Sequence, residues 1–148
     1  MNPEYGSNAL RKTINENIAI VVADFNADIT HLMSKIAKEY LGFLGARVVE
    51  VIRVPGAFEM PLAIQRLLQR KDVDGVVTLG AVIQGDTDHD SIVAGNASRK
   101  IMDLMLVHDK PVSLGIIGPK VTHAAAVARI DEYAKRASES CIKMLRKQ

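Results

Sequence analysis

The sequence predicts an α/β fold in which four parallel strands form a central sheet covered by helices on both faces. Two observations predict it. Four short apolar runs, rich in β-branched residues, are each followed by a loop and then by apolar residues at helical spacing. These runs are also apolar at successive positions, as strands buried on both faces of a parallel sheet are. The alternation therefore predicts one three-layer α/β/α domain.

Each element is indicated by its own pattern and its own end signals. The expected strands are 17–23, 46–54, 74–83 and 111–117. The expected helices are 29–44, 60–70, 92–106 and a long final helix over 122–147. Gly45 ends the first helix, and Pro61 is tolerated in the first turn of the second. Residues 1–16 are polar and unpatterned, and they are expected to form an N-terminal arm of this domain, which spans 1–148.

Composition narrows the class of protein. The chain has 148 residues and a net charge of only +2, without the basic stripe of a nucleic-acid binder. Its one cysteine, Cys141, excludes an internal disulfide and is expected to be a small core residue. No apolar run reaches the roughly 18 residues that would span a bilayer, and no signal core begins the chain. These features predict a cytoplasmic protein that binds neither nucleic acid nor membrane.

Topology predicts where a site would lie. If the strand order is 2-1-3-4, as in flavodoxin-like folds, a crevice opens where the first and third strands end. The loops there are "DFNAD" and "QGDTDHD", so this order brings Phe25 beside His89. Neither a P-loop nor a GxGxxG motif follows any strand, which argues against the common nucleotide-binding sites.

The segment "QGDTDHD" has two interpretations. Thr87 and Asp90 have the spacing of a capping box, which would simply start a helix. Free N–H groups at a helix start after Gly85 would also suit an anion. The surrounding acids oppose an anion, so a cation would have to come from elsewhere in the protein.

His89 is the candidate for proton transfer. Its neighbouring acids favour the imidazolium, whereas the positive helix end disfavours it, and such balanced settings suit general acid–base work. The alternative is an ordinary surface histidine. A metal site would use Asp86, Asp88, His89 and Asp90, but these ligands are crowded and lack a second cluster, so no metal is predicted.

Two further loops carry candidate binding residues. In "VPGAFEMP", Gly56 permits close backbone approach and Glu59 could accept hydroxyl hydrogen bonds from a polyol, unless it only stabilises the helix start. Phe25 could stack on a planar ring or could serve in the core.

Together, these motifs resemble the lumazine synthase family across the chain after the arm. The matching pieces are "DFN", "VPGAFEMPLA" and "GAVIQGDTDHD", in order and at the expected strand ends, and "GDTDHD" with "GIIGPK" is similar to the archaeal branch. The resemblance implies that 5-amino-6-ribitylaminouracil is condensed with 3,4-dihydroxy-2-butanone 4-phosphate, without metal or organic cofactor. The product would be 6,7-dimethyl-8-ribityllumazine, made for riboflavin biosynthesis, with release of phosphate and water.

The resemblance also implies roles for individual residues. Phe25 would stack on the pyrimidine ring, backbone groups of Val82 and Ile83 would read its edge, and His89 would transfer protons. The residues implied for the ribityl chain are Gly56, Ala57, Phe58 and Glu59, and those implied for the phosphate are Gly85, Asp86 and Thr87.

Other implied residues come from the second half of the chain. Arg129, about seven residues into the expected final helix, would supply the phosphate-binding cation. Leu114 stands where many bacterial members have an aromatic residue that closes a neighbouring subunit's site. Lys135 and Arg136 compete for a further basic position. The family's glycine-rich break in the last helix is missing from "RIDEYAKRASES". The family assembles as pentamers, some of which form 60-subunit shells.

Two alternatives remain at this point. An archaeal-type riboflavin synthase is a paralogue that has no phosphate to hold, which "GDTDHD" and Arg129 argue against. A non-enzymatic, flavodoxin-like module that binds flavin or relays phosphorylation belongs to a different class. Only Asp24 fits the acidic cluster of a phosphorylation relay, and Lys120 fits its lysine poorly.

Overall fold

The structure is a computed structural model that describes residues 15–147. Its strands are β1 (Asn17–Ala23), β2 (Arg47–Val54), β3 (Gly75–Ile83) and β4 (Val112–Val121). Its helices are α2 (Ala27–Phe43), η1 (Ala57–Glu59), α3 (Met60–Leu68), α4 (His89–His108), α5 (His123–Val127) and α6 (Ile130–Arg146). The predicted N-terminal arm lies outside the described residues, apart from its last two positions.

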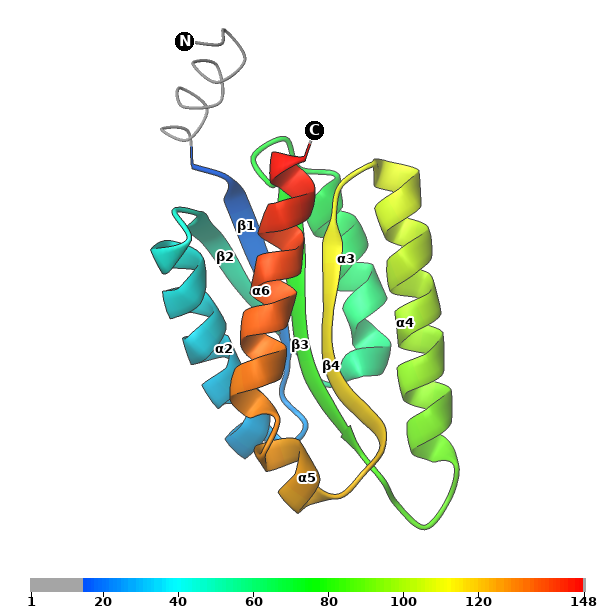
Figure 1. Ribbon diagram of the computed structural model, residues 1–148. Helices are drawn as coiled ribbons and strands as arrows, with labels where there is room; N and C mark the ends of the chain where they lie inside the picture. The colour runs from blue at the N-terminus through cyan, green and yellow to red at the C-terminus, as the bar shows by residue number, and fades with distance from the viewer. Residues whose placement is uncertain (1–14, 148) are drawn as a thin grey trace, which may run out of the picture.

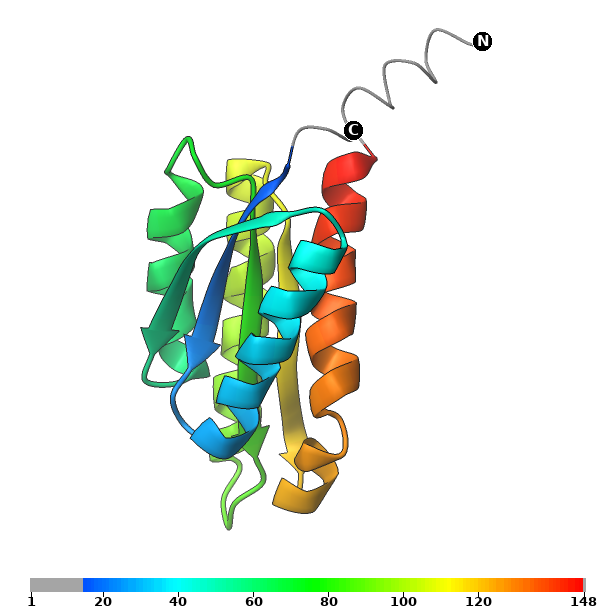
Figure 2. The same ribbon diagram turned by 90° about the vertical axis from the view of Figure 1, so that its left-hand side faces the viewer.

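The four strands form one parallel sheet in the order β2-β1-β3-β4, which confirms the predicted order. Helices α2 and α6 cover one face, and α3 and α4 cover the other, as Figures 1 and 2 show. All strands end at the same edge of the sheet, so the loops that follow β1, β2 and β3 lie together there.

Strand β1 shows how the pattern of side chains builds both layers. Ile18, Ile20 and Val22 enter the core beneath α2 and α6, and the alternating positions Ala19 and Val21 enter the core beneath α3 and α4. Every residue from Ile18 to Ala23 is at most 2% exposed. Burial on both faces explains why the run is continuously apolar rather than alternating.

Strand β4 is longer than predicted, and its end is irregular. Between Ala81 and Ile83 the paired strand advances from Ile117 to Val121, so β4 carries extra residues there. Gly118 has a φ of +112°, which L side chains rarely adopt, and it sits against the backbone of β3. We call Gly118–Lys120 the GPK bend. The predicted strand stopped at residue 117 because this segment has no β-branched pattern.

The single final helix predicted over 122–147 is wrong. Thr122 caps the short helix α5 by accepting a hydrogen bond from the N–H of Ala125 at 3.1 Å. A turn then interrupts the helix, because the N–H of Arg129 bonds three residues back, to the carbonyl of Ala126. Arg129 is therefore the N-cap of α6 and not an interior helical residue. The loop "VPGAFE" likewise contains a helical turn, η1.

The described ends of the chain are tied together. The carboxylate of Glu16 accepts hydrogen bonds from the guanidinium of Arg146 at 2.7 and 3.1 Å. Partial burial acts to raise the pKa of Glu16, but the hydrogen bonds and charge of Arg146 outweigh it, so this pKa lies below its usual value.

Cys141 lies in the core as predicted, where burial raises the pKa of its thiol to about 12. None of the helices in residues 15–147 is long and apolar enough to cross a membrane.

Candidate active site

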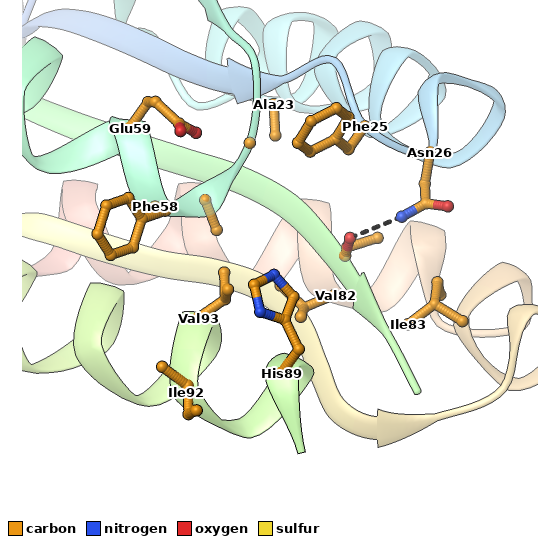
Figure 3. A pocket seen from close by; sticks show the side chains of 13 residues that line it. Ala23, Phe25, Asn26, Phe58, Glu59, Val82, Ile83, His89, Ile92 and Val93 are labelled. Atoms are coloured by element: carbon orange, nitrogen blue, oxygen red, sulfur yellow. Dashed lines mark hydrogen bonds between the residues drawn. The ribbon is translucent and has the colours of Figure 1, made fainter. Parts of the chain in front are cut away.

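A pocket of about 530 Å³ lies at the carboxyl edge of the sheet. The loops after β1 and β2, the end of β3 and the start of α4 surround it (Figure 3). The predicted site residues that line it are Phe25, Gly56, Ala57, Phe58, Glu59, Val82, Ile83 and His89. Ala23, Asn26, Ala81, Ile92 and Val93 complete the lining. The predicted residues that do not line it are Gly85, Asp86, Thr87, Leu114 and Arg129.

Phe25 forms one wall, and two features of the backbone place it there. The N–H groups of Asp24 and Phe25 bond to the carbonyls of Val54 and Pro55, so the loop continues the pairing of β1 with β2. Gly56 leaves room for the ring, since a Cβ at that position would lie 2.6 Å from a ring carbon of Phe25. The ring is 65% exposed, so its face is open toward the pocket rather than packed in the core.

The polar cluster of Asp24, His31 and Arg53 supports the same loop. The carboxylate of Asp24 accepts a hydrogen bond from Arg53 Nε at 2.9 Å and lies 3.2 Å from His31 Nε2. Arg53, and then His31, hold the pKa of Asp24 below its ordinary value. His31 therefore contributes to a hydrogen-bonded network beside the Phe25 wall.

Asn26 lines the pocket but was not among the predicted site residues. It adopts a left-handed conformation (φ 61°) at the start of α2, which asparagine tolerates better than most residues. Its amide nitrogen donates to the carbonyl of Ala81 at 2.9 Å (Figure 3). This bond joins the β1 loop to β3. Because its partners are 55 residues apart, no local sequence pattern predicts it.

His89 is the first residue of α4, and it stands across the pocket from Phe25 and Glu59. Its ring points into the pocket, with Ile92 and Val93 following on the same helix (Figure 3). An imidazole on the rim of a largely apolar pocket can exchange protons with a bound molecule and with water. Ile92 and Val93 were not predicted as pocket residues, because their spacing is that of ordinary apolar positions in a helix.

Of the two interpretations of "QGDTDHD", the capping box at Thr87 and Asp90 is wrong. The N-cap of α4 is Asp88, and it makes no side-chain cap bond. The hydroxyl of Thr87 accepts a bond from the N–H of His89 at 3.3 Å, two residues on. The carboxylate of Asp90 turns away, to the backbone N–H of Lys120 at 2.9 Å, because Asp90 lies on the buried side of the helix.

The predicted phosphate residues are exposed beside the pocket. Gly85, Asp86 and Thr87 form an exposed loop, and a Cβ on Gly85 would meet no atom within 4 Å. Arg129 is exposed at the α5–α6 turn, and Leu114 is 50% exposed on the edge strand β4. The open space at Gly85 leaves room for a ligand or a neighbouring molecule against its backbone.

The two competing basic positions in α6 both have partners within the helix. Lys135 pairs with Asp131 at 3.2 Å and lies over the ring of Tyr40, whereas Arg136 pairs with Glu132 at 3.0 Å. Within residues 15–147, no group of three or more His, Cys, Asp or Glu side chains has the arrangement of a metal site.

Residues 15–148 match the family model of 6,7-dimethyl-8-ribityllumazine synthase. The chain belongs to this family. A relative from Methanocaldococcus jannaschii is 54% identical over 131 residues, which are 88% of this chain and 92% of the relative. A relative from Methanothermobacter thermautotrophicus is 57% identical over 130 residues, which are 88% of this chain and 93% of the relative. Both relatives bear the name 6,7-dimethyl-8-ribityllumazine synthase, and their archaeal source agrees with the predicted branch.

A third relative, from Picrophilus torridus, is 56% identical over 129 residues, covering 87% of this chain and 94% of its own. It carries the same name. The family match therefore favours lumazine synthase over the riboflavin synthase and flavin-module alternatives.

Proposed function

We propose that this chain makes 6,7-dimethyl-8-ribityllumazine from 5-amino-6-ribitylaminouracil and 3,4-dihydroxy-2-butanone 4-phosphate, as a transferase of riboflavin biosynthesis. One observation carries the proposal. In a member of this family, a flat aromatic side chain, a carboxylate and an imidazole face one pocket, on Phe25, Glu59 and His89. Those three groups match a planar ring, a polyol chain and a proton transfer, respectively.

The pyrimidine binds on the Phe25 side of the pocket. Its ring stacks on Phe25, and its edge bonds to backbone groups of Val82 and Ile83 at the end of β3. The ribityl chain lies along Gly56 to Glu59, where the Glu59 carboxylate accepts hydrogen bonds from the hydroxyls. The proposal is supported by the lining, in which all these positions surround one cavity.

The chemistry then needs orientation more than unusual groups. The pyrimidine amine condenses with the ketone of the phosphosugar to form an imine with loss of one water, the phosphate is eliminated, and the second ring closes with loss of a second water. Holding two reactants in register supplies much of the acceleration. His89 moves protons between the reacting amine, the ketone oxygen and solvent, a contribution of about 10²–10⁴-fold.

The phosphate binds over the exposed loop of Gly85, Asp86 and Thr87. Backbone N–H groups at the start of α4 and the Thr87 hydroxyl are suitable donors. The nearby carboxylates of Asp86 and Asp88 repel an anion, so the site needs a cation, and Arg129 is the proposed one. The exposure of both the loop and Arg129 is consistent with a phosphate position at a surface of this chain.

The site is completed by a second copy of the chain, in a pentamer or in a 60-subunit shell built from pentamers. Two observations support this assembly. Arg129 and Leu114 are exposed and do not line the pocket that the other proposed residues share. Leu114 also belongs to an edge strand, where an apolar side chain is available to a neighbour.

The direct experiment mixes the purified chain with the two substrates and follows lumazine absorbance and inorganic phosphate. The proposal predicts that both products rise together at a rate proportional to enzyme. A protein that instead converts added lumazine to riboflavin would be the paralogue. One that retains flavin and is inactive in both assays would be the binding module.

A further inference from the structure

Asp90 differs from the other acids of the segment "GDTDHD". Asp86 and Asp88 are exposed, whereas Asp90 is only 6% exposed although it has a carboxyl side chain and lies in the first turn of α4. A carboxylate is costly to bury unless it is hydrogen-bonded. Its partner is the N–H of Lys120, 2.9 Å from Oδ2, in the GPK bend 30 residues away.

The GPK bend is a firm anchor for this bond. Lys120 has a left-handed φ of 60°, and a Cβ on Gly118 would lie 2.3 Å from the carbonyl oxygen of Val82, so the bend sits tightly on the end of β3. Just beyond it, the carbonyl of Val121 accepts a bond from the N–H of Gln84 at 2.8 Å. The bend is therefore fixed to the strand end that also supplies Val82 to the pocket.

The other side-chain hydrogen bonding at the start of α4 is weak. Its N-cap residue Asp88 makes no side-chain cap bond, and the bond from His89 N to the Thr87 hydroxyl is long at 3.3 Å and exposed. His89 comes immediately before Asp90 and faces the pocket. The bond of Asp90 thus ties the first turn of α4, which carries the imidazole, to the GPK bend at the end of β3.

From this arrangement we infer that Asp90 is a positioning residue, which holds His89 at the reacting atoms by tying the first turn of α4 to the GPK bend. The inference rests on the proposed function, because it assumes that His89 transfers protons. Asp90 itself touches neither substrate. It acts through the placement of its neighbour, since small displacements of a catalytic group reduce the rate strongly.

The first test compares three variants of the full-length protein with both substrates. Asp90→Ala removes the acceptor, and we expect kcat to fall about 10-fold or more with little change in the KM for the pyrimidine. Asp90→Asn keeps an oxygen that can accept the Lys120 N–H, and we expect it to retain at least about a third of the wild-type kcat. Asp103→Ala, which removes an exposed acid farther along α4, is the matched control and should leave kcat unchanged.

A double-mutant cycle then separates positioning from a general loss of structure. If Asp90 acts through His89, adding Asp90→Ala to the His89→Ala variant changes the residual kcat by less than about 2-fold. Equal losses in the two backgrounds would overturn the inference, as would a wild-type kcat in Asp90→Ala. Should Asp90→Ala not fold, Asp90→Thr replaces it, since its hydroxyl is too short to reach Lys120.

The outcomes also separate this inference from the proposed function. An inactive wild-type protein would contradict the proposed function before any variant is compared. An active wild-type protein with an indifferent Asp90 would contradict only the positioning role.

Discussion

The two halves of the candidate site are built to different degrees within one chain. On the pyrimidine side, Phe25, Glu59 and His89 converge on one pocket and are placed by strand ends, a close glycine and backbone hydrogen bonds. On the phosphate side, the loop at Gly85 is exposed, and Arg129 stands apart from the pocket. The residues of the first half line one pocket within a single chain, whereas Gly85 and Arg129 of the second half do not line a common pocket.

The two halves differ in which parts of the protein hold their residues in place. Parallel strands bring the loops after β1, β2 and β3 to one edge, so one chain suffices to assemble the pocket proposed for the pyrimidine ring. Arg129, at the turn between α5 and α6, and Leu114, within β4, do not line that pocket, and a symmetric assembly can bring such residues to a neighbour's pocket. The comparison therefore predicts that changes in the two halves have different kinetic signatures.

The largest effect is expected from His89→Ala. Loss of the proton-transfer group should lower kcat by about 10²–10⁴-fold while leaving turnover measurable, because orientation of the substrates remains. Steady-state rates with both substrates measure it, and His108→Ala, at the other end of α4, is the control. A wild-type kcat would remove His89 from the chemistry and leave the pocket half without a catalytic group.

The next effect is expected from Arg129→Ala, and it should appear in a different constant. Loss of a charge-assisted contact should raise the KM for the phosphosugar about 10- to 100-fold, with little change for the pyrimidine. Arg66→Ala, at an exposed arginine of α3, controls for the loss of charge. If only the pyrimidine KM rose, Arg129 would belong to the other half of the site.

Much of the built half was predictable, and the reason is physical. The apolar runs identified the strands, and the convergence of parallel strand ends placed Phe25 near His89. The roles of Asn26 and Asp90 could not be predicted, because their side chains form hydrogen bonds to Ala81 and Lys120, which lie 55 and 30 residues away in the sequence. The break before α6 was missed because neither glycine nor proline marks the turn at Arg129.

A smaller effect is expected from Gly56→Ala. The added Cβ would lie 2.6 Å from the ring of Phe25 and 3.3 Å from Glu59 Oε2, and the exposed ring can swing away. The KM for the pyrimidine should rise about 3- to 10-fold, with the melting temperature nearly unchanged, since such a displacement loses aromatic stacking of about 0.5–1.5 kcal/mol. Gly95→Ala is the matched control, because a Cβ there meets nothing within 4 Å. An unchanged pyrimidine KM would contradict the placement of Phe25.

The smallest effect concerns the pH dependence of stability through Asp24. Its pKa is lowered in the folded protein, so its stabilisation is present above its unfolded pKa of about 3.9 and is lost as pH falls through the folded pKa. The melting temperature of Asp24→Asn should therefore be slightly below that of the wild type at pH 6, and the two should converge as the pH falls through the lowered folded pKa of Asp24. A gap that widens toward low pH would have the wrong sign for this account.

The most direct test of the central claim is complementation between the two halves. His89→Ala and Arg129→Ala chains, each impaired alone, are co-expressed so that they assemble together. If each site takes its pocket from one chain and Arg129 from a neighbour, random mixing restores both wild-type halves at about a quarter of the sites. The account predicts that lumazine formation recovers to about that fraction of the wild-type rate. Activity no higher than the average of the two separate variants, in particles shown to contain both chains, would contradict it.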